Sequence, residues 1–225
     1  MRSNSCMRSS LNVVDFFKAL KYRRDFRKSH PDYFDPDGIL VFCGSQGSGK
    51  TLSAVRYIRD ICVKYPKCKI ISNITLNIPE HECIPYKYLE QLDEIDIGET
   101  GAIVFIDEIQ VLFGSLESKG ISPSQLSIIC QQRKRRVHIV GTSQLFSRMA
   151  KPFREQVSTI VDCKSVLGVL QFNRIVDFDS IELTESGDVD KYKYNGFYLF
   201  PHTPQLYSMY DTLQKVTKGN IAFKR

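Results

Sequence analysis

The sequence predicts an α/β fold of three layers, in which a central and mostly parallel β-sheet lies between layers of helices. Two observations support this prediction. From residue 38 to residue 160, short apolar segments alternate with helical segments, which is typical of parallel sheets built from βαβ units. After residue 160, β-branched and aromatic residues dominate. We therefore expect an N-terminal tail with a basic amphipathic helix (1–37), an α/β core (38–160) and a β-rich C-terminal extension (161–225).

Each expected element of the core has its own signal. The strands are short apolar segments: Ile39–Cys43, Lys69–Asn73, Ala102–Ile106 and His138–Gly141. The helices expected between them are Thr51–Tyr65, Tyr86–Leu92 and Ser124–Arg133. Parallel strands joined by right-handed crossovers have their carboxyl ends at one edge of the sheet, which is where ligands bind in such folds.

The segments on either side of the core have different patterns. Before the core, apolar residues at helical spacing predict an amphipathic helix over Leu11–Phe26. After the core, Ser158–Val161 and Val166–Val176 are rich in β-branched residues and predict strands. Asn195 and Gly196 lie between aromatic segments, and this dipeptide favours the turn of a β-hairpin.

Composition and charge narrow the class of protein. The 225 residues are 42% hydrophobic, near the globular average, and carry a net charge of +6. No apolar segment approaches the ~18 residues that a membrane span needs, and the first residues do not form a secretory signal. We therefore expect a soluble cytoplasmic protein.

The cysteines do not form a recognisable framework. There are seven: Cys6, Cys43, Cys62, Cys68, Cys83, Cys130 and Cys163. Their number is odd, and no two have the C-x-x-C spacing of many zinc sites. We therefore expect small buried hydrophobic residues in a reducing compartment, and neither disulfides nor a zinc site.

A glycine-rich segment predicts a phosphate-binding loop. The pattern G-x-x-x-x-G-K-[ST] is matched at every position by Gly44, Ser45, Gln46, Gly47, Ser48, Gly49, Lys50 and Thr51. Glycines at this spacing let backbone N–H groups point into a nest at the positive end of the following helix, where a phosphate binds. Lys50 is expected to reach the β- and γ-phosphates, and Thr51 to hold Mg²⁺. No guanine-reading N/T-K-x-D element is present, so ATP and Mg²⁺ are the expected cofactors.

Two acidic residues end the expected strand Ala102–Ile106. Asp107 lies where a Mg²⁺-holding carboxylate belongs, at the carboxyl end of the strand. Glu108 follows it and is expected to activate the attacking water. An aspartate alone would also suit a small-molecule kinase, whereas the added glutamate favours ATP hydrolysis.

Polar and basic residues surround the expected strand His138–Gly141. After this strand, Gln144 is expected to contact the γ-phosphate or the attacking water. Before it, Arg133, Arg135 and Arg136 have three interpretations: they stabilise transition-state charge in their own or a neighbour's site, contact nucleic-acid phosphates, or form a solvated helix end. A second basic cluster consists of Lys18, Lys21, Arg23, Arg24, Arg27 and Lys28.

Taken in order, these motifs resemble the FtsK–HerA branch of P-loop ATPases. Within it, the chain is similar to the zonular occludens toxin (Zot) family, which includes the assembly ATPase of filamentous phages. The resemblance rests on the phosphate loop, Asp107 with Glu108, the arginine-rich segment, Val140–Gln144, Ile71–Ile74 and Tyr207–Thr212. It covers residues 38–160 well and 161–215 loosely.

The resemblance implies both an architecture and a function. The strand His138–Gly141 would lie between the phosphate-loop strand and the Asp107 strand. The chains would form rings, often hexamers, in which an arginine acts across subunits. By position, Lys50 and Thr51 would bind nucleotide and Mg²⁺, and Asp107 would support the metal. Glu108 would activate water and Gln144 would sense the γ-phosphate.

Three hypotheses of function follow. The first is a viral or mobile-element ATPase that translocates or packages double- or single-stranded DNA, with a capsid or membrane-protein partner. It would act in the cytoplasm of the bacterial host if it is phage-encoded, or at the periphery of a membrane or virion. Zot-type proteins usually have a membrane span after the ATPase domain, and its absence from residues 149–225 favours a soluble packaging motor over extrusion. The second is an ATPase that drives protein assembly or secretion at a membrane through partner subunits. The third is a small-molecule kinase with Gly114–Ser122 as its lid.

Overall fold

The computed structural model describes residues 12–35, 38–114, 121–183 and 189–211. The chain divides into two compact units, Met1–Tyr33 and Phe34–Arg225. In the first unit, the expected basic helix is present as α1 (Val13–Ser29). Asn12 caps it, because the Asn12 side chain accepts a hydrogen bond from the backbone N–H of Val14 at 3.1 Å. No residue of α1 is buried.

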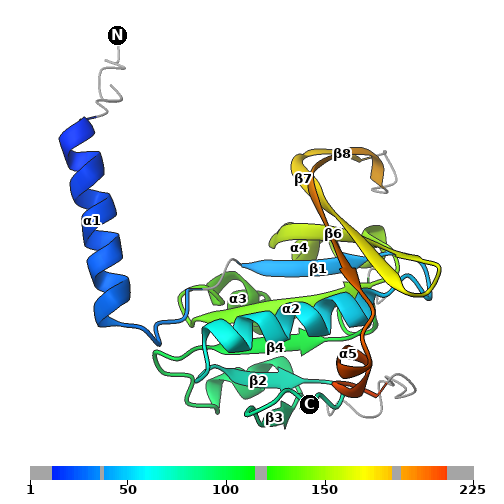
Figure 1. Ribbon diagram of the computed structural model, residues 1–225, viewed down its shortest axis with the longest axis horizontal. Helices are drawn as coiled ribbons and strands as arrows, with labels where there is room; N and C mark the ends of the chain where they lie inside the picture. Colours follow the sequence, from blue (N-terminus) through cyan, green and yellow to red (C-terminus); the bar gives the residue numbers. More distant parts are fainter. Residues whose placement is uncertain (1–11, 36–37, 115–120, 184–188, 212–225) are drawn as a thin grey trace. The chain divides into compact units, whose positions relative to one another are not determined.

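The second unit is built on one sheet. Within the described residues the sheet has eight strands in the order β3-β2-β4-β5-β1-β6-β7-β8 (Figure 1). The strands are β1 (Ile39–Cys43), β2 (Lys69–Ser72), β3 (Cys83–Pro85), β4 (Ala102–Ile106), β5 (Val137–Ser143), β6 (Val157–Val166), β7 (Leu170–Leu183) and β8 (Val189–Pro201). The pairs among β1–β6 are parallel, and β7 and β8 pair antiparallel. The expected mostly parallel sheet with a β-rich extension is therefore confirmed, and β5 lies between β1 and β4.

Helices cover both faces of this sheet. They are α2 (Lys50–Lys64), α3 (Pro123–Gln131), α4 (Lys151–Arg154) and α5 (Pro204–Ser208), with 3-10 segments at Leu89–Asp93, Ile109–Val111 and Phe146–Arg148. The two longer expected helices are thus confirmed with slightly shifted ends, whereas the helix expected at Tyr86–Leu92 is a 3-10 segment. Ser122 fixes the start of α3 through a reciprocal capping box with Gln125.

The continuous apolar strands are explained by burial on both faces. All residues of β1, β4 and β5 are buried. Successive residues of β1 enter different cores: Leu40 and Phe42 pack with α2, whereas Ile39 and Val41 pack with α3 and α4. Because side chains alternate across a strand, such a sheet needs an apolar layer on each side. The predicted three-layer fold is therefore confirmed.

The prediction of a hairpin turn at Asn195 and Gly196 is wrong. Both residues lie inside β8, where Gly196 pairs with Ile175 and Tyr194 pairs with Val176 of β7. Asn195 is therefore the extra residue of a β-bulge. The turn between β6 and β7 is instead made at Leu167 and Gly168, whose φ angles of 52° and 67° suit a tight hairpin. The aromatic segments around Asn195 pair with β7, not with each other.

The boundary expected between residues 160 and 161 falls inside β6, which pairs with β1 on one side and β7 on the other. The division into 1–37, 38–160 and 161–225 therefore stays a proposal about functional parts.

Two expected segments lie outside the described residues: 115–120 of the expected lid, and 1–11 of the N-terminal tail. Within the described part of the chain, no helix is both long and apolar enough to cross a membrane.

Candidate nucleotide-binding site

The phosphate loop connects β1 to α2 and depends on glycine at defined positions. Gly49 has a φ of 82° and is the N-cap of α2, and a Cβ atom there would lie 2.0 Å from the Gln171 side-chain oxygen. At Gly44, a Cβ atom would lie 2.7 Å from the backbone oxygen of Cys163. Other residues would therefore collide or be strained at both positions. Because α2 begins directly after the loop, its first N–H groups have no partner within the helix and can bind an anion.

Two buried polar groups of the loop suit an anionic ligand. Lys50 is only 6% exposed, and its ammonium donates to the neutral backbone carbonyl of Ser45 at 3.1 Å. Within the described residues Lys50 forms no ion pair, and the buried hydroxyl of Ser48 has no hydrogen-bond partner. A buried cation is costly without a counter-charge. A bound phosphate group would supply both the charge and the hydrogen-bond acceptors.

The predicted Mg²⁺ residues meet at the carboxyl end of β4. Asp107 Oδ1 accepts hydrogen bonds from the hydroxyls of Thr51, at 2.9 Å, and Thr142, at 2.8 Å. The Asn73 side chain holds the Asp107 backbone, accepting from its N–H at 2.8 Å and donating to its carbonyl at 2.9 Å. Three segments that are distant in sequence therefore position one carboxylate. No pattern in the sequence predicted a role for Thr142 or Asn73.

The surroundings of Asp107 also suit a cation. The pKa of the Asp107 carboxyl is raised above its usual value, mainly by burial, although the hydrogen bonds from Thr142 and Thr51 lower it. Neighbouring Glu108 raises it further, and Lys50 lowers it. A buried carboxylate is stabilised most directly by a metal ion, and adjacent carboxylate and hydroxyl oxygens are the ligands that Mg²⁺ prefers. The residues present therefore fit the ion.

Glu108 is held in an unusual backbone conformation. Its φ and ψ are 52° and 54°, in the left-handed region that residues other than glycine rarely adopt. Its backbone N–H donates to the Thr142 hydroxyl at 2.9 Å, and its carboxylate accepts from the side chain of Gln110. Strained positions of this kind persist where surrounding contacts fix them, and they are concentrated at functional sites.

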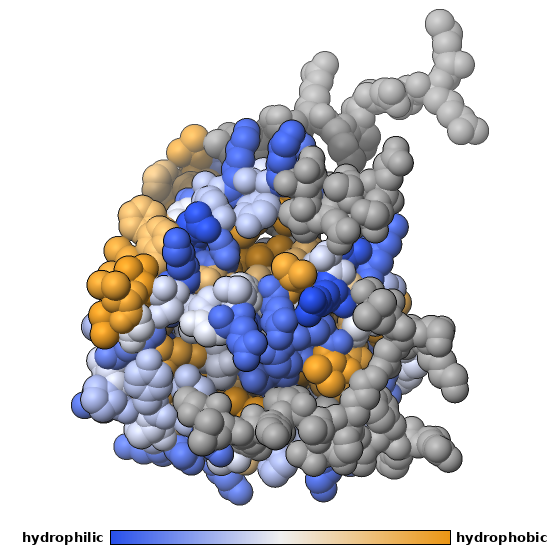
Figure 2. All heavy atoms as spheres, turned by 90° about the vertical axis from the view of Figure 1, so that its right-hand side faces the viewer, coloured by the Kyte–Doolittle hydropathy of each residue, from blue (hydrophilic) through white to orange (hydrophobic). Residues whose placement is uncertain are grey.

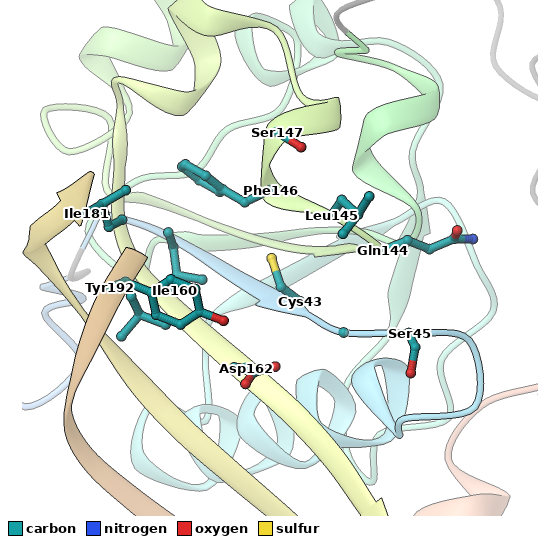
Figure 3. A pocket seen from close by; sticks show the side chains of 12 residues that line it. Cys43, Ser45, Gln144, Leu145, Phe146, Ser147, Ile160, Asp162, Ile181 and Tyr192 are labelled. Atoms are coloured by element: carbon teal, nitrogen blue, oxygen red, sulfur yellow. The ribbon is translucent and has the colours of Figure 1, made fainter. Parts of the chain in front are cut away.

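A cavity of about 440 Å³ opens beside Gly44 and Ser45 (Figure 3). Gln144 and Ser45 lie at the same end of it, and the Gln144 side-chain oxygen accepts a hydrogen bond from Arg148 at 3.1 Å. The rest of the lining is mainly apolar: Cys43, Leu145, Phe146, Ile160, Val176, Ile181 and Tyr192, with the polar residues Ser147 and Asp162. Figure 2 views the molecule from the side on which the loop lies and shows a hollow with hydrophobic residues inside a hydrophilic surround.

A second cavity lies between the phosphate loop and residues of the C-terminal extension that the sequence patterns did not indicate. A cavity of about 370 Å³ is bounded by loop residues Gly44–Ser48, by Asp162–Ser165 and by Arg174. Arg174 pairs with Asp162 across β6 and β7, and its guanidinium carbon lies 4.2 Å from the ring centre of Tyr194. The Tyr194 hydroxyl also donates to Asp162, at 2.9 Å. No local signal marks Arg174, because only the antiparallel pairing of β7 brings it to the loop.

The predicted arginines lie at the other end of the sheet. Arg133, Arg135 and Arg136 precede β5, whereas the phosphate loop follows the neighbouring parallel strand β1. The seven residues of β5 span about 20 Å, at about 3.3 Å per residue. Arg135 pairs with Asp93, and Arg136 donates to the Gly98 carbonyl at 3.3 Å. These arginines are therefore not brought to the phosphate loop of their own chain.

Gln171 of β7 holds the phosphate loop in place through a buried hydrogen bond. It is fully buried, and its amide nitrogen donates to the Ser48 carbonyl and to Asn173, both at 2.9 Å. Asn173 in turn bonds Ser53 of α2 at 3.0 Å. The network fixes the loop and the first turns of α2 against the extension.

We expect Gln171→Leu to lower the free energy of unfolding by about 1–3 kcal/mol, because it leaves the buried Ser48 carbonyl without its donor. Urea unfolding of the nucleotide-free protein measures this. Gln205→Leu, at an exposed position of α5, is the matched control and should unfold as the wild type does. Equal stabilities of the two variants would contradict the bracing role.

Comparison with known proteins identifies a family that this chain matches. Residues 38–215 match the family described as "Zonular occludens toxin (Zot)". The N-terminal domain of zonular occludens toxin from Neisseria meningitidis superimposes with a TM-score of 0.53 and 16% identity, covering 78% of this chain and 100% of that chain. A second solved structure, described as an ATPase domain, superimposes with a TM-score of 0.50 and 10% identity. The match covers 92% of this chain and 100% of that chain. The DNA-packaging ATPase B204 from Sulfolobus Turreted Icosahedral Virus superimposes with a TM-score of 0.46 and 13% identity, covering 59% of this chain and 78% of that chain. A search of curated proteins found no match.

At these identities the first two structural similarities establish the fold, which is that of P-loop NTPases. The family match is broader, because it spans the phosphate loop, the acidic end of β4 and the extension up to residue 215. On this evidence the chain belongs to the zonular occludens toxin (Zot) family.

Proposed function

We propose that this protein is a Mg²⁺-dependent ATPase that acts as a motor for viral or mobile-element DNA, in genome packaging or virion assembly. The observation that carries the proposal is the hydrogen bond between Thr51 and Asp107, which joins the phosphate loop to the acidic end of β4. Triphosphate hydrolysis in P-loop enzymes needs these two residue types next to each other.

Each residue of the site has a role in this reaction. Lys50 neutralises charge on the β- and γ-phosphates, and the N–H groups at the start of α2 bind their oxygens. Thr51 and Asp107 would hold Mg²⁺, which would further neutralise the charge that develops on the phosphates. Glu108 accepts a proton from the attacking water. Gln144, at the mouth of the apolar cavity, orients that water or contacts the γ-phosphate.

The same cavity suits the nucleoside. Its volume of about 440 Å³ and its lining of Leu145, Phe146 and Tyr192 favour a flat aromatic base. The cavity begins at Gly44 and Ser45, so a base placed there remains connected to phosphates on the loop.

A catalytic role for the predicted arginines implies a ring or another assembly of subunits. Arg133, Arg135 and Arg136 lie at the opposite end of the sheet from the phosphate loop, so a catalytic role for any of them requires a neighbouring subunit. Family membership and the net charge of +6 support DNA as the partner.

A second candidate is an ATPase that drives protein assembly or secretion at a membrane. The observation that favours it is α1, where Phe16, Phe17 and Leu20 are 52%, 63% and 49% exposed. Basic residues Lys18 and Lys21 lie among them. A helix that combines exposed apolar and basic residues suits an anionic membrane surface or a membrane-protein partner.

One experiment separates the two candidates. ATP hydrolysis is measured with Mg²⁺ alone, with double- or single-stranded DNA, and with anionic lipid vesicles, while light scattering gives the mass of the nucleotide-bound state. We expect DNA to raise the rate several-fold in a salt-sensitive manner, and the mass to be that of a ring.

Lys50→Ala serves as the inactive control in every condition. A rate that no form of DNA changes would remove DNA from the proposal, and stimulation by vesicles alone would favour the second candidate. Absence of Mg²⁺-dependent hydrolysis in all conditions would overturn the ATPase assignment itself.

A further inference from the structure

Two cysteines and a histidine meet outside the nucleotide site. Cys62 lies in the last turns of α2, Cys68 directly precedes β2, and His81 lies in the segment between β2 and β3. Their possible ligand atoms all lie within 4.8 Å of one another. Cys62 and Cys68 are 2% and 4% exposed, whereas His81 is partly exposed. The two sulfur ligands are therefore buried, and the partly exposed histidine lies at the edge of the core.

The orientation of His81 prepares one ring nitrogen for a ligand. Its Nδ1 lies 3.0 Å from the Pro79 carbonyl oxygen, and a carbonyl can only accept, so Nδ1 carries the proton. Nε2 then presents its lone pair. This atom is buried and has no hydrogen-bond partner within the described residues. Histidines that bind metals characteristically donate their other N–H to a backbone carbonyl in this way.

The spacing of the two sulfur atoms also favours a shared metal ion. The Sγ atoms of Cys62 and Cys68 lie 3.9 Å apart. Two sulfurs bound at about 2.3 Å to one tetrahedral Zn²⁺ would be about 3.8 Å apart. A disulfide would need about 2.05 Å. The observed separation excludes a disulfide and would let both sulfur atoms bind one ion without moving.

The donor chemistry of the cluster points to the same kind of ion. The thiolate is the form of cysteine that binds metals. Sulfur with imidazole nitrogen is the donor set that selects Zn²⁺ over Mg²⁺, which prefers oxygen.

We propose that Cys62, Cys68 and His81 bind one Zn²⁺ ion, with water or a further ligand in the fourth position. The sequence predicted no zinc site because the cysteines lack C-x-x-C spacing, and the third ligand comes from a separate loop. The ion joins the end of the phosphate-loop helix α2 to β2 and to the segment before β3. It therefore stabilises β2, which is followed by Asn73 and pairs with β4, the strand that precedes Asp107.

The test uses Co²⁺ as a spectroscopic probe for Zn²⁺ in the full chain. The protein is purified under reducing conditions, stripped with a chelator and titrated with Co²⁺ alone. We expect the visible ligand-field bands and the thiolate charge-transfer band of a tetrahedral site, reaching saturation at one equivalent and disappearing when Zn²⁺ is added. Cys68→Ser should lower the charge-transfer intensity from that of two thiolates to that of one at most.

His81→Ala is the most informative variant, because this side chain is partly exposed and its loss leaves the core intact. Loss of a direct ligand should weaken Co²⁺ binding by about 100-fold or more, since loss of an outer hydrogen-bond partner already costs roughly 10–100-fold. Cys130→Ser and His30→Ala are matched controls at exposed positions and should bind as the wild type does.

Three results would overturn the proposal: no tetrahedral spectrum in the wild type, an unchanged spectrum in the Cys62→Ser, Cys68→Ser double variant, or a thiol count in non-reduced protein that shows these two cysteines joined in a disulfide. The zinc site does not rest on the proposed ATPase function. Lys50→Ala protein should bind Co²⁺ normally, so failure of one proposal is distinguishable from failure of the other.

Discussion

Glu108→Gln is expected to bind ATP with near wild-type affinity and to hydrolyse it about 10²–10⁴-fold more slowly, because the amide cannot accept a proton from the attacking water. The substitution keeps the size of the side chain. Its amide oxygen can still accept from Gln110, so the strained backbone at this position retains its support. Single-turnover hydrolysis and equilibrium binding of a fluorescent ATP analogue measure the two effects separately.

Glu155→Gln is the matched control, since Glu155 is exposed at the end of α4. It should hydrolyse ATP at the wild-type rate. A Glu108→Gln protein that also keeps this rate would show that another group activates the water, and Asp107 would then be the carboxylate to test next. Weak ATP binding by Glu108→Gln would instead mean that Glu108 serves the metal.

Lys50→Ala is expected to weaken ATP binding by about 100-fold or more. Loss of one partner of a buried, hydrogen-bonded charge pair costs about 2–5 kcal/mol, and about 1.4 kcal/mol corresponds to tenfold in affinity. The nucleotide-free variant should be at least as stable as the wild type, because the substitution removes a buried ammonium that forms no ion pair within the described residues and whose hydrogen bond goes to a neutral carbonyl. Isothermal titration with ATP and urea unfolding of the nucleotide-free protein test both statements.

Lys64→Ala provides the control at the exposed end of the same helix and should bind ATP as the wild type does. Wild-type affinity in Lys50→Ala would place the triphosphate somewhere other than the loop. A strong loss of stability in the nucleotide-free variant would show that Lys50 is a structural residue. The two measurements together therefore distinguish a ligand-binding role from a folding role.

The elements predicted correctly from sequence are those with local causes. Strands such as Ile39–Cys43 and Ala102–Ile106 are apolar without interruption because both of their faces are buried. The phosphate loop needs glycine where the backbone turns and packs closely, so its pattern is also local. Asn195 shows where local signals fail, because its aromatic neighbours pair with β7 and the favoured turn becomes a bulge.

The sequence by itself determined the α/β class, the phosphate loop and the acidic end of β4, since each depends on residues that are adjacent along the chain. Only the tertiary structure decided which distant residues complete the sites. Strand pairing brings Arg174 and Gln171 to the loop and leaves Arg136 at the far end of the sheet. The fold also brings His81 to two cysteines. The physical reason is that hydrogen-bonded register and packing, not sequence separation, set the distance between side chains.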